Sequence, residues 1–281
     1  MIVRKMVRLL TAVVQLSKLD RMPTTSPRHF TFTLLLFLTL LSSLTAQTNR
    51  FASRKHIVAG DTLAYRLLVP DYDTMRKYPL VVFLHGSGER GTDNEVQLKW
   101  GALNFATDQA MTAHPAIVLA PQCPPGARWD NFERAGSGSR KLTLKAEPSK
   151  QVAVLIDLVR QLSKQMAIDT NRIYITGLSM GGFGTFDMIQ RYPSLFAAAV
   201  PVCGGGDSAR AASIAHLPIW VFHGAEDPSV DVRMSDDMVN ALTIAGAHPG
   251  YTRLPETGHF AWLAAYTDTL MMEWLFRQRK K

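Results

Sequence analysis

The sequence predicts an α/β fold in which helices cover both faces of a mostly parallel central sheet. Two observations support this fold class, and a third indicates a single domain. Short apolar segments alternate with longer segments of helical periodicity. Several of the short segments are apolar throughout, as in strands that are buried on both faces. The chain shows no internal repeat and no long linker, so we expect one domain over residues 48–281.

The expected strands are short and rich in β-branched or apolar residues. LAYRLLV (63–69) precedes a polar turn, while LVVFL (80–84) and AIVLA (116–120) are continuously apolar. RIYITG (172–177) runs directly into a Gly-rich turn. The remaining expected strands lie at residues 197–202, 218–222 and 250–254.

The expected helices lie between these strands. Residues 151–166 carry apolar side chains at helical spacing, and residues 234–245 follow the strand at 218–222. A helix ending near Arg191 follows the Gly-rich turn, and a single closing helix is expected over 260–277. Because ligands of such sheets bind beyond the carboxyl ends of the strands, we look for the chemistry there.

The N-terminal residues 1–46 read as an extension and a signal peptide. The uncharged, Leu-rich run 30–44 follows Arg28 and ends near Ala46, where we expect cleavage. The run is shorter than the roughly 20 residues of a membrane span, although an uncleaved anchor is the alternative. Met22 is a better start for such a leader than Met1. We therefore expect an exported protein, periplasmic or secreted, that has no membrane segment after cleavage.

The net charge of +8 comes mainly from this leader. Residues 1–46 hold six of the 31 basic residues and one of the 23 acidic residues, so the rest of the chain has a net charge of +3. The charge therefore does not indicate binding to nucleic acid. Cys123 and Cys203 each follow an expected strand, and either a disulfide between them or two buried free thiols fits an exported protein.

The pentapeptide GLSMG (177–181) matches the G-x-S-x-G pattern between a strand and a helix. Such a sharp turn exposes the serine hydroxyl above the sheet, so Ser179 is the candidate nucleophile. A serine needs a histidine base, and the base needs an acid to orient it. His259 lies in the expected loop between the last strand and the closing helix. Asp227 follows the strand at 218–222, with Glu226 and Asp231 as the alternatives.

An oxyanion intermediate needs backbone N–H donors close to the serine. The amide of Met180, at the start of the helix, is one candidate, and the amide of Ser87 in the Gly-rich loop after LVVFL is the other. We expect His85 in this loop to be structural. Glu89 and Arg90 either pair with each other or brace the loop.

The segments HGSGERG (85–91), GLSMGG (177–182), HGAEDPSV (223–230) and TGHFAW (257–262), in this order, resemble the esterase/dienelactone hydrolase branch of the α/β-hydrolases. Bacterial proteins labelled predicted peptidase, phospholipase/carboxylesterase-like or polyhydroxybutyrate-depolymerase-like are the most similar. The resemblance covers about residues 63–276. It implies the α/β-hydrolase fold and a catalytic domain with Ser179, Asp227 and His259 as the triad.

The resemblance also points to residues that contact substrate. An aromatic residue near APQC (120–123) lies close to the pocket in that branch, which suggests Trp129; Gly86 and Phe260 flank the predicted site. The polar segment 128–149 either lines the pocket or is a surface excursion. Nothing in the chain resembles a large lid insertion, and this favours small or polysaccharide-linked esters over long-chain fat.

The predicted reaction is hydrolysis of a carboxylic ester, such as a carbohydrate acetyl or feruloyl ester, through an acyl-enzyme on Ser179. We expect no cofactor and no metal, since the chain has no HExxH, Walker or Cys/His ligand pattern. The alternatives are a serine peptidase of the prolyl-oligopeptidase type and a non-catalytic binding protein. The sequence does not indicate an oligomeric state.

Overall fold

The central feature of the computed structural model is an eight-stranded sheet with the strand order β1-β2-β4-β3-β7-β8-β9-β10. The structure describes residues 47–71, 73, 75–136 and 140–280, which fall in one compact unit. The strands of the sheet are β1 (Phe51–Val58), β2 (Asp61–Leu68), β3 (Tyr78–Leu84), β4 (Ile117–Pro121), β7 (Ile168–Leu178), β8 (Ala198–Val202), β9 (Trp220–Gly224) and β10 (Gly250–Leu254).

The sheet is mostly parallel, as predicted. Strands β4, β3, β7, β8, β9 and β10 pair in parallel, whereas β1 and β2 join one edge in antiparallel pairs. Every residue of β3, β4 and β8 is buried, because helices cover both faces of the sheet. The carboxyl ends of the parallel strands therefore lie along one edge, where the connecting loops meet.

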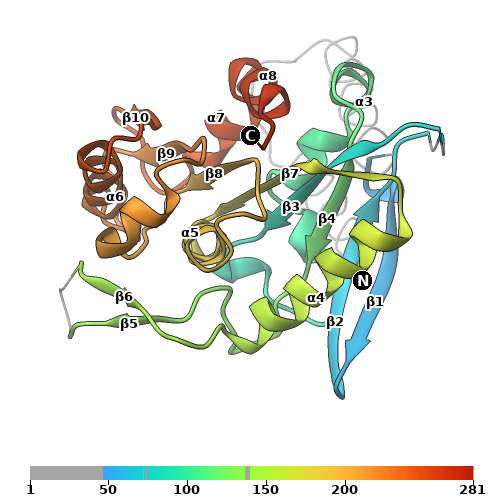
Figure 1. Cartoon of the computed structure of the whole chain (residues 1–281), viewed down its shortest axis with the longest axis horizontal. Helices are drawn as coiled ribbons and strands as arrows, with labels where there is room; N and C mark the ends of the chain where they lie inside the picture. The colour runs from blue at the N-terminus through green and yellow to red at the C-terminus, as the bar shows by residue number, and fades with distance from the viewer. Residues whose placement is uncertain (1–46, 72, 74, 137–139, 281) are drawn as a thin grey trace, which may run out of the picture. The chain divides into compact units, whose positions relative to one another are not determined.

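Two layers of helices enclose the sheet, and each layer has its own apolar core (Figure 1). On one face lie α4 (Lys150–Gln165), α5 (Met180–Arg191) and α6 (Arg233–Ile244). The other face is covered by the 3-10 helix η3 (Ala102–Ala106) and by α7 (Trp262–Thr267) and α8 (Thr269–Arg277). A short helix, α3 (Asp108–Ala113), lies before β4.

Helix α4 shows how local sequence determines an element. Ser149 caps its start by accepting a hydrogen bond from the amide of Val152. The buried face follows at helical spacing through Val152, Leu155, Leu158 and Leu162. The predicted helix at 151–166 therefore matches the observed one to within a residue.

The predicted closing helix at 260–277 is wrong in one respect: it is two helices, α7 and α8. The break falls at Asp268, whose side chain accepts hydrogen bonds from the amides of Leu270 and Met271. An aspartate in this arrangement caps a new helix and ends the previous one. The end of α8 is held against the sheet, because the Tyr174 hydroxyl of β7 donates to the Gln278 carbonyl at 2.7 Å.

The segment 128–149 contains a two-stranded hairpin of β5 (Phe132–Arg134) and β6 (Leu142–Leu144), which runs beneath α5 toward α6 (Figure 1). Its apolar residues Phe132, Leu142 and Leu144 are buried. The Asp207 carboxylate accepts a hydrogen bond from the Leu144 amide at 3.0 Å and fixes β6 against the domain. The hairpin therefore belongs to the core of the domain.

The predicted leader and its cleavage site near Ala46 lie outside the described residues. In the described part of the chain, no helix has the length and apolar character needed to cross a membrane. Cys123 and Cys203 are both buried free thiols and form no disulfide with each other.

Candidate active site

Ser179 lies at the turn between β7 and α5, in a backbone conformation that serine rarely adopts. Its φ is 53° and its ψ is −115°, and it immediately precedes α5. Such strain persists only where the surroundings enforce it. Here the helix packs directly on β3: a Cβ atom on Gly181 would lie 2.0 Å from the Leu84 carbonyl oxygen. The glycines of the GLSMG turn thus allow the close approach that presents Ser179 at the strand end.

His259 and Asp227 come from two other loops at the same edge of the sheet. The His259 Nε2 atom lies 2.9 Å from Ser179 Oγ, and its Nδ1 atom lies 2.6 Å from Asp227 Oδ2. The loop that carries Asp227 and the loop that carries His259 pack tightly together, since a Cβ atom on Gly224 would lie 2.1 Å from the Gly258 carbonyl oxygen. The structure therefore brings together the three side chains that the sequence predicted as a triad.

Asp227 is held by hydrogen bonds on both carboxylate oxygens. Its Oδ1 accepts from the amides of Ser229 at 2.8 Å and Val230 at 2.9 Å, which is an Asx-type turn. Burial alone would raise the pKa of Asp227, but hydrogen bonds from His223, His259 and these two amides lower it well below its usual range. Asp227 is thus an anion, so the Nδ1 atom of His259 carries the hydrogen between them.

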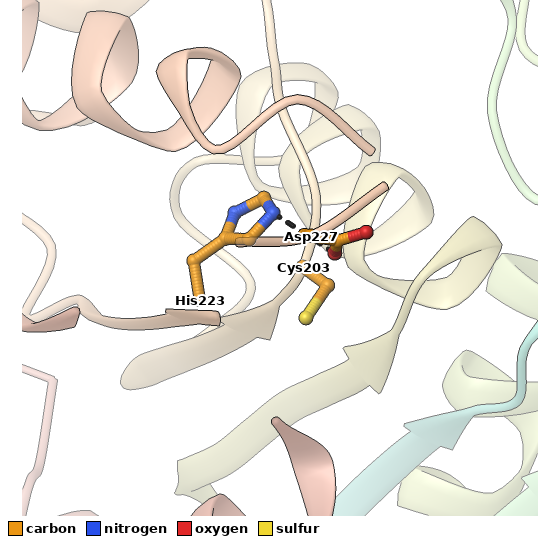
Figure 2. A group of neighbouring side chains, drawn as sticks. All are labelled: Cys203, His223 and Asp227. Atoms are coloured by element: carbon orange, nitrogen blue, oxygen red, sulfur yellow. Dashed lines mark ion pairs between the residues drawn. The ribbon is translucent and has the colours of Figure 1, made fainter. Parts of the chain in front are cut away.

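A second histidine, His223, also contacts the Asp227 carboxylate (Figure 2). Its Nε2 lies 3.2 Å from Asp227 Oδ2 and 3.0 Å from the Val230 carbonyl oxygen. Both neighbours are acceptors, so Nε2 carries a hydrogen and donates. The ring is completely buried, and its Nδ1 contacts the Ser235 hydroxyl at 2.7 Å. His223 therefore anchors the carboxylate that orients His259.

Cys203 completes this cluster. Within the described residues, one atom each of Cys203, His223 and Asp227 lie within 4.8 Å of one another, a spacing that a metal ion could span. Their chemistry favours hydrogen bonds instead. Burial and the charge of Asp227 raise the pKa of the Cys203 thiol to about 12, so the thiol keeps its proton and donates to the His259 carbonyl oxygen at 3.6 Å. A metal ligand needs the thiolate, and His223 Nε2 offers no lone pair.

The predicted oxyanion donors lie at the same pocket as the serine. Ser87, Ser179 and Met180 all line a pocket of about 300 Å³. Ser87 begins a short 3-10 helix, η1 (Ser87–Glu89), and Met180 is the first residue of α5. Both candidate donors are thus the first residues of helices and line the pocket that contains Ser179.

Buried groups behind the pocket keep the Ser87 loop in place. His85 Nδ1 donates to the Gly86 carbonyl at 2.6 Å, and His85 Nε2 accepts from the Cys123 amide at 2.9 Å. Burial lowers the pKa of His85 to about 4, so the ring is neutral, which fits its predicted structural role. Burial raises the pKa of Glu89, while the Gly86 amide donates to its carboxylate and acts in the opposite direction. Glu89 thus braces the loop, and Arg90 bonds separately to the Ala127 carbonyl.

The three predicted substrate contacts lie in different surroundings. Trp129 is completely buried and does not line the pocket; its Nε1 donates to the His85 carbonyl at 3.2 Å, so it supports the loop from behind. Gly86 caps η1 beside Ser87. Phe260 is 56% exposed next to His259 and meets Trp100 edge to face.

The alternative acids do not reach His259. The His259 Nδ1 atom bonds to Asp227, whereas Asp231 pairs with Arg233 at the start of α6 and Glu226 is exposed. The contact of His223 with Asp227 and the two arginines at the pocket, Arg128 and Arg134, were not predicted from the sequence. The spacing of His223 and Asp227, four positions apart across one tight loop, was the available signal for the first.

Comparisons with known proteins agree with this fold. A family model described as phospholipase/carboxylesterase matches residues 73–268. Poly(3-hydroxyalkanoate) depolymerase C of Paucimonas lemoignei is 31% identical over 133 residues. The bifunctional acetylxylan esterase/xylanase XynS20E of Neocallimastix patriciarum is 28% identical over 149 residues. A crystal structure of a thermostable esterase superposes with a TM-score of 0.77 at 40% identity.

The matched regions are parts of those proteins. They cover 45% of this chain and 28% of the depolymerase, and 53% of this chain and 19% of the esterase/xylanase. The thermostable esterase matches 83% of this chain over 64% of its own length. The chain therefore spans less than two thirds of the length of each of these proteins.

Proposed function

This chain belongs to the phospholipase/carboxylesterase family of α/β-hydrolases, and from that premise we propose that it hydrolyses carboxylic esters with Ser179 as the nucleophile. The observation that carries the proposal is the continuous chain of contacts from Ser179 Oγ through His259 to the Asp227 carboxylate, at 2.9 Å and 2.6 Å. Such a chain activates a hydroxyl that is otherwise a weak nucleophile at neutral pH.

In the acylation step, His259 Nε2 removes the proton as Ser179 Oγ attacks the carbonyl carbon of the ester. The carbonyl oxygen gains negative charge, which the amides of Ser87 and Met180 stabilise. His259 then returns the proton to the departing alcohol. Asp227 keeps the hydrogen on Nδ1 and stabilises the imidazolium.

In the deacylation step, a water molecule replaces the alcohol. His259 removes a proton from this water as its oxygen attacks the acyl carbon, and it then returns that proton to Ser179 Oγ. The carboxylic acid leaves, and the serine is regenerated.

We propose a small or polysaccharide-linked ester as the substrate class. A pocket of about 300 Å³ beside Ser179 suits a short acyl or alcohol group, such as the acetyl or feruloyl esters of carbohydrates. The acetylxylan esterase relative supports a carbohydrate-linked ester. Export, to the periplasm or the medium, is part of the same proposal, because polysaccharide esters occur outside the cytoplasm; peptide mapping of the N-terminus of the processed protein tests it.

The test of the mechanism compares the protein from Gln47 onward with its Ser179→Ala variant. We expect turnover of p-nitrophenyl acetate and butyrate, falling for octanoate, and a loss of about four orders of magnitude or more in the variant. A peptide p-nitroanilide serves as the counter-substrate. Turnover of the anilide alone would replace the esterase proposal with a peptidase, and ester turnover that survives in the variant would exclude Ser179 as the nucleophile.

A further inference from the structure

The pocket beside Ser179 contains two arginine side chains, Arg128 and Arg134. We propose that they bind a carboxylate of the substrate, so that the favoured esters carry a negative charge on the acyl or the alcohol part. This inference rests on the proposed function and names the substrate class of the same site. The groups that carry it are the two guanidinium groups, the buried carboxylate that holds them, and the apolar side chains around them.

Asp130 holds both arginines in place. Its side chain is 2% exposed, and its Oδ2 accepts from Arg128 Nε at 3.0 Å and from Arg128 Nη2 at 2.7 Å. Its Oδ1 accepts from Arg134 Nη2 at 3.3 Å. A buried carboxylate that fixes two guanidinium groups reduces the side-chain entropy that would otherwise be lost on binding a ligand.

Most N–H groups of the two arginines have no partner in the described part of the protein. A guanidinium group has five N–H donors, of which Arg128 uses two and Arg134 uses one on Asp130. The two side chains are 42% and 39% exposed, so their remaining donors are accessible from the pocket. Planar donors of this kind match the two oxygens of a carboxylate.

The charges around the pocket leave one positive charge uncompensated. Asp130 neutralises one of the two arginines. Asp231, which also lines the pocket, pairs with Arg233 and so is neutralised separately. The Asp227 carboxylate is completely buried and does not line the pocket. An anionic group would restore the charge balance there.

The environment of Arg134 supports the same conclusion. Burial lowers its pKa, Asp130 acts in the opposite direction, and the like charge of Arg128 lowers it further. Its guanidinium group lies 5.0 Å from the centre of the Phe183 ring. Met180 and Met234 line the same pocket. A bound carboxylate would relieve the repulsion between the arginines on a partly apolar surface, where charge-assisted hydrogen bonds are stronger than in water.

The first experiment uses pairs of esters that are similar in size and differ in charge. Monomethyl succinate and methyl pentanoate place the difference on the acyl side, whereas acetoxyacetate and propyl acetate place it on the alcohol side. Titration of the released acid gives kcat/KM for each. We expect the anionic member of at least one pair to have the higher kcat/KM, by about tenfold. A preference for the neutral member in both pairs would overturn the inference.

The second experiment assigns the preference to the arginines. Arg134→Gln leaves Asp130 paired with Arg128, and the hairpin keeps the hydrogen bond from the Leu144 amide to the Asp207 carboxylate. We expect the ratio of kcat/KM for the anionic to the neutral ester to fall about tenfold. Arg277→Gln on α8 removes the same charge away from the pocket. We expect it to leave kcat/KM unchanged for both the anionic and the neutral ester. An unchanged ratio in Arg134→Gln would contradict the proposal.

Binding gives a readout that does not depend on turnover. In the Ser179→Ala background, titration calorimetry should show monomethyl succinate or acetoxyacetate binding more tightly than its neutral counterpart, and adding Arg134→Gln should remove the difference. Equal binding of the charged and neutral esters overturns the arginine subsite. Failure of the esterase proposal appears separately, as absence of turnover by the wild-type protein for every ester.

Discussion

At the scale of single residues, the candidate triad depends on a histidine that does not contact the serine. His223 donates to the same Asp227 oxygen, Oδ2, that His259 contacts, and it is itself held by Ser235. The orientation of Asp227 therefore depends on a completely buried side chain that also donates to the Val230 carbonyl oxygen.

We expect His223→Asn to lower kcat about tenfold or more while leaving KM for p-nitrophenyl butyrate near the wild-type value. The shorter amide does not reach Oδ2, so Asp227 orients His259 less well, and misplaced catalytic groups reduce the rate of the chemical step. Steady-state kinetics measures kcat and KM separately, and circular dichroism checks that the variant is folded. His216→Asn at the surface is the matched control; an unchanged kcat in His223→Asn would argue against a positioning role.

His85 predicts how stability depends on pH. Burial lowers its pKa to about 4 in the folded state from an ordinary value of 6.5. Between these values the unfolded chain binds a proton that the folded chain does not, so stability is complete above about pH 6.5 and falls as the pH drops toward about 4. The neutral His85 side chain therefore contributes roughly 3 kcal/mol to the free energy of unfolding above this pH range.

Urea unfolding at several pH values across this range measures the effect. The free energy of unfolding should fall by roughly 3 kcal/mol less on acidification in His85→Gln than in the wild-type protein. The variant is expected to be less stable than the wild-type protein at neutral pH. Parallel pH profiles of the two proteins would show that other groups account for the acid sensitivity.

At the scale of elements, the buried parallel strands and the edge strand β10 were predictable, whereas the edge strand β1 was not. LVVFL and AIVLA are apolar throughout because both faces are covered, and they appear as β3 and β4. Strand β1 (FASRKHIV) exposes most of its residues, and its charged side chains give no apolar signal. The hairpin β5–β6 was also missed, since each strand has only three residues.

The same reasoning explains which parts of the site were predictable. Ser179, Asp227 and His259 follow strands or occupy loops that the sequence pattern defines, and so their meeting could be anticipated. Arg128 and Arg134 become neighbours only through Asp130 and the fold of the hairpin. Side-chain contacts within an irregular segment leave no periodic pattern in the sequence. Trp129 was expected at the pocket, but packing against His85 buries it behind the loop.

The division between α7 and α8 makes a prediction about stability. We expect Asp268→Ala to cost about 1 kcal/mol, because the amides of Leu270 and Met271 lose their capping acceptor. Chemical unfolding measures this loss, and Asp268→Asn, which can still cap, should recover most of it. The site is formed elsewhere, so kcat/KM should stay constant; no loss in Asp268→Ala would indicate that packing alone defines the start of α8.

At the scale of the whole molecule, the two cysteines report on global unfolding. Cys123 and Cys203 lie in the separate cores on the two faces of the sheet, and both are completely buried. Burial raises the pKa of each thiol to about 12. Neither thiol is accessible or ionised in the folded protein.

We therefore expect Ellman's reagent to leave both thiols unmodified at about pH 8 and to label both at similar rates once urea unfolds the chain. Mass spectrometry of the Cys123→Ala and Cys203→Ala variants distinguishes the two positions. Rapid labelling of Cys203 alone in native protein would indicate local opening of the loops that carry Asp227 and His259.

The chain order of the triad has a consequence for synthesis. Ser179 and Asp227 emerge from the ribosome well before His259, which follows the last strand of the sheet. The base also reaches the serine only when β10 has paired with β9 and the α7–α8 layer has closed the second core. A nascent chain that lacks β10 and the α7–α8 layer therefore cannot bring His259 to Ser179, so we expect no acylation of Ser179 at that stage of synthesis.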